Sequence, residues 1–153
     1  MACVFCTNLD IRARMIIGSN KLAWAFPTNI PITEGHTLVV PVRCVGRFEE
    51  LTEDERRALE ELRYQITEAL KSAFGAEGFN FAWNDGEVAG QSVPHLHLHI
   101  VPRKKGDTGI HNYDPRKFLY RTGDRPETPE EELSQVALRI KKALDLTSLS
   151  QDT

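Results

Sequence analysis

The chain has 153 residues, a formal net charge of −3 at neutral pH and an ordinary share of apolar residues. This charge argues against nucleic acid as a partner, and no apolar stretch approaches the length of a membrane helix. The first residues contain neither a basic region nor a long apolar run, so we expect no secretory signal and, by default, a cytoplasmic location. The length suits one domain, which we place at residues 1–146, followed by a polar, frayed tail at 147–153.

Two cysteines, Cys3 and Cys6, open the chain in a Cys-x-x-Cys arrangement, and Cys44 is the third. An odd set of cysteines without an export signal argues against disulfides. A redox motif of the thioredoxin type would follow a strand, and none precedes Cys3. Metal binding and simple burial of the thiols both remain open from the residues alone.

Short apolar runs bounded by turn residues predict an antiparallel sheet. The expected strands are residues 14–19 and 21–27, which form a hairpin, followed by 37–42 and 78–83. Residues 27–36, with two prolines, should form a loop.

Two helices are predicted. Thr52 and Glu55 have the spacing of a capping box, and apolar residues at helical spacing follow them to about Phe74, just before Gly75. A second helix should begin at Thr128-Pro129, because proline is favoured at the first helical position. The apolar stripe of each helix is expected to be core.

The most informative stretch is residues 90–103. His95, His97 and His99 alternate with apolar residues, which predicts a strand with all three imidazoles on one face. Three imidazoles in a row suit metal ligands, acid–base or nucleophilic groups, or a pH-sensing surface. A zinc site that uses all three is a rival interpretation on geometry alone. The preceding residues supply backbone N–H groups, an amide and a hydroxyl, which suit an oxyanion such as phosphate; they are Gly90, Gln91 and Ser92.

Residues 103–125 carry seven basic and three acidic residues, a local charge of +4. Scattered charges of this kind are usually a solvated loop. A polyphosphate substrate would nevertheless use them, and we hypothesise that Lys104 and Lys105 hold its distal phosphates.

The stretch His-Leu-His-Leu-His-Ile-Val, residues 95–101, resembles the His-φ-His-φ-His-φ-φ signature (φ apolar) of the histidine triad (HIT) superfamily of nucleotide hydrolases and transferases. Gly35-His36 and residues 84–92 resemble further family motifs, so the likeness covers roughly residues 3–106. It implies an α+β, HIT-like fold: an antiparallel sheet of about five strands, one long helix and a C-terminal helix. It also implies a homodimer.

The resemblance implies a catalytic role for the triad. His97 would be the nucleophile that attacks the α-phosphorus, with its ring held by the backbone carbonyl of His95. His99 would contact the phosphate, and Ser92 would help to protonate the leaving group. His36 would lie behind the triad as a hydrogen-bond partner.

Substrate contacts follow from the same resemblance. Thr28 stands where relatives carry the Asp or Asn that contacts the ribose, and Asn29 is next to it. The full substrate-binding set that we expect is Thr28, Asn29, Asn84, Gly90, Gln91, Ser92 and His99.

Zinc-bearing relatives use the N-terminal cysteine pair, the first triad histidine and the residue three positions after the proline that ends the Gly-His strand. Cys44 occupies that last position here, where many relatives carry histidine. The resemblance therefore implies a structural zinc held by Cys3, Cys6, Cys44 and His95.

The function that we expect is hydrolysis of a nucleotide at its α-phosphate through a nucleotidyl-histidine. A dinucleoside polyphosphate is the favoured substrate, because residues 102–107 resemble the segment after the triad in hydrolases of these compounds. The alternatives are a nucleoside phosphoramidate hydrolase and a nucleotide-binding module without turnover.

Overall fold

The computed structural model describes residues 3–8, 11, 15–107 and 127–151. Its strands are β1 (Gly18–Ser19), β2 (Ala23–Pro27), β3 (Thr37–Pro41), β4 (Gly78–Ala82) and β5 (Leu98–Arg103). Its helices are α1 (Val4–Thr7), α2 (Glu53–Phe74) and α4 (Glu130–Gln151), with 3-10 turns η2 (Phe48–Glu50) and η3 (Glu87–Ala89). None of the helices in these residues is long and apolar enough to cross a membrane.

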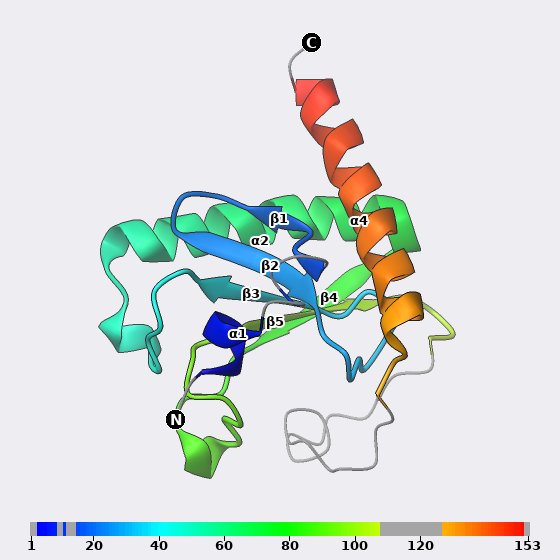
Figure 1. The fold of residues 1–153 in the computed structure, drawn as a ribbon. Helices are drawn as coiled ribbons and strands as arrows, with labels where there is room; N and C mark the ends of the chain where they lie inside the picture. The colour runs from blue at the N-terminus through cyan, green and yellow to red at the C-terminus, as the bar shows by residue number, and fades with distance from the viewer. Residues whose placement is uncertain (1–2, 9–10, 12–14, 108–126, 152–153) are drawn as a thin grey trace.

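The five strands form one sheet in the order β1-β2-β3-β5-β4, and every neighbouring pair is antiparallel. The predicted α+β architecture, with one long helix and a C-terminal helix, is confirmed (Figure 1). Strand β5 lies between β3 and β4, so the histidine-bearing segment belongs to the middle of the sheet rather than to its edge.

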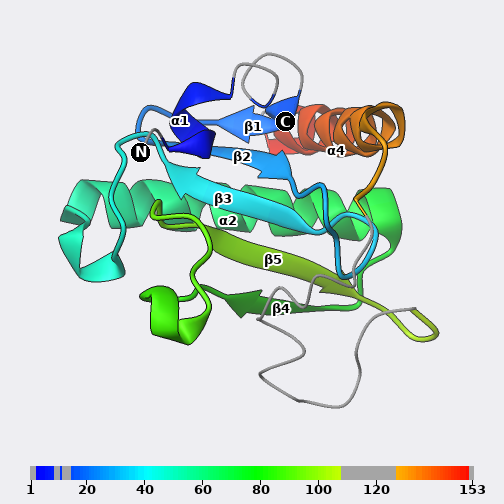
Figure 2. The ribbon, with the colours of Figure 1, turned by 60° about the horizontal axis from the view of Figure 1, so that its bottom comes forward.

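Helix α2 covers one face of the sheet (Figure 2). Its start is the predicted capping box, in which Thr52 Oγ1 accepts from the Glu55 N–H while the Glu55 carboxylate accepts from the Thr52 N–H. The helix ends at Gly75, whose φ of +66° is the left-handed conformation that glycine adopts without strain. Its apolar stripe packs on Val39 and Ile100 to form the larger core, and α4 packs beside it.

A second, smaller core lies on the opposite face of the sheet. In β2, Ala23 and Ala25 belong to the core under α2, whereas Trp24 and Phe26 belong to the other core. Side chains of a strand alternate between faces, so Leu38 of β3 also points to this second face. His99 is the direct cross-strand partner of Leu38, which places the triad on the face away from α2.

The strand that carries the triad begins later than the alternation predicts. Strand β5 starts at Leu98, so His95 and His97 precede it. Their segment is held by other contacts: the Leu96 N–H donates to the Val45 carbonyl at 2.7 Å. Pro94, which has no N–H, stands immediately before it and weakens strand pairing there.

Two other expectations differ from the structure. The first hairpin strand is shorter than predicted, since β1 comprises only Gly18–Ser19 and residues 12–14 lie outside the described part. The backbone from Thr147 is helical rather than frayed as expected, because α4 continues to Gln151. Polar residues without glycine or proline can extend a helix that is already nucleated by packing.

Candidate functional site

The three triad histidines lie in a row on the face opposite α2. The rings of His97 and His99 meet edge to face, with centroids 5.1 Å apart. Phe5 of α1 packs edge-on against the rings of both His95 and His97, at 5.7 and 5.4 Å. The N-terminal turn of the chain therefore covers the first two histidines.

His97 is held as a neutral imidazole. Its Nδ1 lies 2.8 Å from the His95 carbonyl oxygen, so Nδ1 carries the proton and donates it there. Burial lowers the pKa of His97 below its ordinary value of 6.5, outweighing the hydrogen bond to the His95 carbonyl, which acts in the opposite direction. The Nε2 lone pair has no hydrogen-bond partner among the described residues and is available to attack or to accept a proton.

A chain of hydrogen bonds fixes the tautomer of His99. The backbone N–H of Ile32 donates to His36 Nδ1 at 3.0 Å, which leaves the proton of neutral His36 on Nε2. That nitrogen lies 2.9 Å from His99 Nδ1, which must then accept. His99 consequently carries its own proton on Nε2, and His36 lies behind it as a hydrogen-bond partner.

A pocket of about 470 Å³ opens over the second and third histidines. Five predicted site residues line it: Thr28, Asn29, Ser92, His97 and His99. The rest of the lining is mostly apolar and is not predicted from the sequence; it includes Phe5, Ile11, Met15, Phe26, Leu38 and Leu133, together with the acidic residues Glu127 and Glu130. These residues are scattered along the chain and look like ordinary core residues in the sequence. An apolar wall opposite a polar edge suits a ligand with one flat apolar end and one charged end.

Three residues that were expected to bind substrate do not line this pocket: Asn84, Gly90 and Gln91. The Gln91 side chain accepts from the Gly86 N–H and donates to the Gly46 carbonyl, both at 2.8 Å. Asn84 is buried and donates to the Gly90 carbonyl at 3.1 Å. These hydrogen bonds hold the loop before the triad, because both amide side chains bind backbone groups. A direct contact of these side chains with substrate stays a prediction.

The expected phosphate-binding lysines are also placed elsewhere. Lys104 and Lys105 follow β5 at the end opposite His99, and neither lines the pocket. The Lys104 ammonium donates to the Phe74 carbonyl at 3.1 Å, where it caps the C-terminus of α2. The other basic residues of this segment, apart from Arg103, lie outside the described residues.

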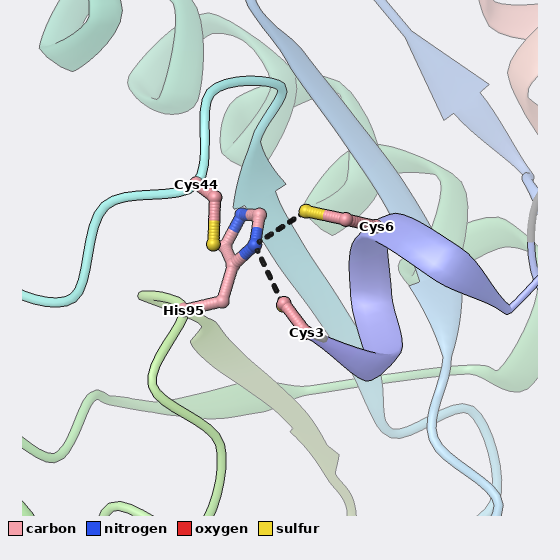
Figure 3. A group of neighbouring side chains, drawn as sticks. All are labelled: Cys3, Cys6, Cys44 and His95. Carbon is pink, nitrogen blue, oxygen red and sulfur yellow. Dashed lines mark hydrogen bonds between the residues drawn. The ribbon is translucent and has the colours of Figure 1, made fainter. Parts of the chain in front are cut away.

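A second cluster joins the N-terminal turn to the triad. The ligand atoms of Cys3, Cys6, Cys44 and His95 all lie within 4.8 Å of one another (Figure 3). Donors bound to a tetrahedral zinc at about 2.0–2.3 Å would lie roughly 3.5–3.8 Å apart, so only small shifts separate this cluster from a zinc site. His95 Nδ1 faces Cys3 and Cys6, at 3.3 and 3.5 Å, while Nε2 lies 2.8 Å from the Pro41 carbonyl.

The cluster has the chemistry of a metal site as well as its geometry. Hydrogen bonding of His95 Nε2 to a backbone carbonyl leaves Nδ1 unprotonated, as a metal requires. Burial, together with the contacts with Cys3 and Cys6, raises the pKa of the Cys44 thiol to about 12. A cation would offset this crowding of sulfur atoms. The four residues therefore could hold a metal ion.

The tautomers can be read directly by long-range nitrogen–proton NMR of the imidazoles, since the chain has only five histidines. At neutral pH we expect the proton on Nδ1 of His97 and on Nε2 of His99. In His36→Ala the His99 ring should lose its fixed tautomer while His97 keeps its own. A proton on Nε2 of His97 in the wild type would contradict the geometry.

Comparisons with known proteins identify the family. The HIT domain family model matches residues 11–106, well over half of the chain. Bis(5'-nucleosyl)-tetraphosphatase (asymmetrical) of Schizosaccharomyces pombe is 42% identical over 87 residues, which are 57% of this chain and 48% of that protein. Bis(5'-adenosyl)-triphosphatase of Dictyostelium discoideum is 39% identical over 97 residues, which are 63% of this chain and 65% of that protein. The match thus spans less than two thirds of either relative.

The fold agrees equally well. A crystal structure of a zinc-bound histidine triad family protein from Mycobacterium smegmatis matches with a TM-score of 0.75 at 28% identity, and 98% of each chain is covered. The sheet order, the His-x-His-x-His row and the family match point to one conclusion: the chain belongs to the HIT domain family.

Proposed function

We propose that the protein hydrolyses dinucleoside polyphosphates at the α-phosphate through a nucleotidyl group on His97. The observation that carries the proposal is the state of His97, which is neutral and fixed through Nδ1. Its Nε2 has no hydrogen-bond partner in the described part of the chain, and the ring lines a pocket of nucleotide size. The names of two HIT relatives, a tetraphosphatase and a triphosphatase of dinucleoside substrates, support the choice of substrate.

The reaction divides into two displacements. In the first, the Nε2 lone pair of His97 bonds to the α-phosphorus, and the phosphorus–oxygen bond to the rest of the polyphosphate breaks. The leaving oxygen takes a proton with help from Ser92, which lines the pocket. In the second, water attacks the same phosphorus, the bond between phosphorus and Nε2 breaks, and the proton of water passes to solvent. This step releases AMP from an adenosine substrate and leaves His97 neutral again.

Fixed donors stabilise the charge that develops on phosphate. The Nε2–H of His99 is held toward this role by the hydrogen bond from His36. Such a donor contributes about 3 kcal/mol to transition-state stabilisation when it replaces water in a dry site. Because the pKa of His97 lies below 6.5, kcat/KM should be fully developed at neutral pH and should fall only as acid protonates Nε2.

The pocket orients the substrate. The aromatic and aliphatic wall formed around Phe5, Phe26 and Leu38 suits a nucleobase, which has apolar faces. Thr28 and Asn29 line the same pocket and would contact the ribose. Binding energy from the nucleoside would then place the α-phosphorus beside His97.

The first test compares diadenosine tri- and tetraphosphate with adenosine phosphoramidate. We expect the wild type to release AMP fastest from a dinucleoside polyphosphate. His97→Ala should lose activity by a factor of about 10⁵, and His99→Ala by a factor of about 10²–10³.

The outcome separates the functional classes. Faster turnover of the phosphoramidate would make the protein a phosphoramidate hydrolase that uses the same nucleophile. Binding of AMP without turnover of any substrate would reduce it to a nucleotide-binding module. Full activity in His97→Ala would remove the proposed mechanism.

We propose zinc as the ion of the sulfur-rich cluster. Three thiolates and one imidazole nitrogen form a closed, four-ligand set without an open position, which is characteristic of a structural site. A zinc-bound structure within the family supports this identity. Zinc would supply no chemistry at the phosphate; it would tie Cys3 and Cys6 to the segment that begins the triad.

Elemental analysis of protein purified without chelators should find one zinc per chain. Cys44→His should retain the metal, because imidazole nitrogen is an equivalent zinc ligand, whereas Cys44→Ala should bind it far more weakly. A zinc-free wild type with reduced thiols would overturn the assignment.

The expected homodimer is also a proposal, and an exposed surface beside β4 supports it. Strand β4 is the edge of the sheet, and a groove of about 540 Å³ next to it exposes Phe48, Phe81 and Trp83. Arg56 and Arg63 lie over two of these rings, and Glu60 lies in the same groove. A twofold axis at this edge would cover the aromatic rings.

Light scattering should therefore give the mass of two chains. Trp83→Arg should shift the protein to one chain, whereas Leu146→Arg, at an exposed apolar position on α4 outside the groove, should not. A single-chain wild type would contradict the dimer.

A further inference from the structure

Helix α1 serves two sites at once. It is one turn, Val4–Thr7, with Cys3 at its N-cap and Cys6 inside it, and both thiols belong to the metal cluster. Phe5 lies between them, is only 7% exposed and lines the pocket over His97. A helix of this length has no stability of its own in water, so its position depends on what holds it.

Phe5 packs this turn against the triad, beside the Cys3 and Cys6 thiols that face His95. Its ring meets Phe26 at 5.3 Å and His97 at 5.4 Å, both edge-on. Val4 and Asn8 line the pocket beside it. Movement of α1 would therefore remove part of the apolar wall and uncover the His97 ring.

The other half of the metal cluster stands on a fixed scaffold. Arg43, next to Cys44, holds the Glu55 carboxylate through two hydrogen bonds of 3.2 and 2.7 Å, at the start of α2. The same loop is bonded to the triad segment through Val45 and to Gln91 through Gly46. His95 is fully buried and bonded to the Pro41 carbonyl.

The two halves of the metal cluster therefore differ in how firmly the fold positions them, and this difference determines which half metal binding would order. Cys44 and His95 are positioned by the fold, whereas Cys3 and Cys6 are carried by a single helical turn, whose buried apolar side chain is Phe5. Binding of a metal would thus dock α1, and docking of α1 would complete the pocket. The converse follows from linkage: a ligand that packs against Phe5 favours the docked turn.

We propose that zinc at this cluster and a nucleotide in the pocket bind with positive coupling, and that Phe5 is the positioning residue through which they are coupled. The proposal rests on the nucleotide site proposed above. It assigns Phe5 no chemical step: the ring acts by holding the pocket wall against the nucleoside. Coupling between two sites is typically 5–150-fold, and we expect about tenfold here.

The experiment measures AMP binding by calorimetry to the zinc-loaded protein and to the chelator-treated protein. AMP should bind about tenfold more weakly without zinc. Zinc affinity, measured by competition with a chromophoric chelator, should rise by the same factor in saturating AMP. Equal AMP affinity in both forms would overturn the coupling, whereas absence of AMP binding to the loaded protein would contradict the nucleotide site itself.

Substitutions separate coupling from general damage. The Phe5→Ala variant keeps all four zinc ligands, so it can be prepared with and without zinc. The ratio of its AMP affinities in these two forms should approach one. Phe5→Leu, which restores an apolar side chain, should recover part of the ratio. Val40→Ala weakens the same hydrophobic cluster without lining the pocket, and it should keep the wild-type ratio. If the AMP affinities of zinc-loaded and zinc-free Phe5→Ala differed by the same factor as in the wild type, Phe5 would be excluded as the residue that couples the two sites.

Discussion

The site depends on the way His95 is held. One nitrogen of its ring bonds to the Pro41 carbonyl, the other faces the cysteines, and its backbone carbonyl accepts the Nδ1 proton of His97. A single buried residue therefore sets the tautomer of the proposed nucleophile and anchors the metal cluster. Because both ring nitrogens and the carbonyl of His95 are engaged, a shift of this residue would change the position of His97 and of the N-terminal turn together.

The sheet separates stability from chemistry. Helix α2 buries one face and forms the larger core, with fully buried Leu62, Ile66 and Leu70. The opposite face carries the smaller core around Phe26 and Leu38, and this core is also the wall of the pocket. Apolar residues on that face thus have two duties, since they exclude water from His97 and would receive the nucleoside.

Periodicity and local motifs account for what the sequence could predict. The capping box at Thr52 and the glycine at position 75 define α2 because both act locally, through the hydrogen bonds of a helix end. The metal cluster was reached through resemblance, and the structure brings its four residues together. The wall around Phe5 and Met15 was missed because burial against a ligand and burial in a core look the same in one sequence. Gln91 and Lys104 were assigned to substrate by chemical type, whereas long-range backbone contacts, which no local pattern encodes, engage them.

The central claim is that the nucleotidyl group is transferred to His97 before water attacks its phosphorus. Its most direct test is the stereochemical course of the hydrolysis. The substrate is a dinucleoside polyphosphate whose α-phosphorus carries a sulfur in one known configuration, and it is hydrolysed in oxygen-18 water. Two in-line displacements invert the phosphorus twice, so the account predicts a thiophosphate product with net retention of configuration. Net inversion would show that water attacks the substrate directly, and it would contradict a nucleotidyl-histidine on the reaction path.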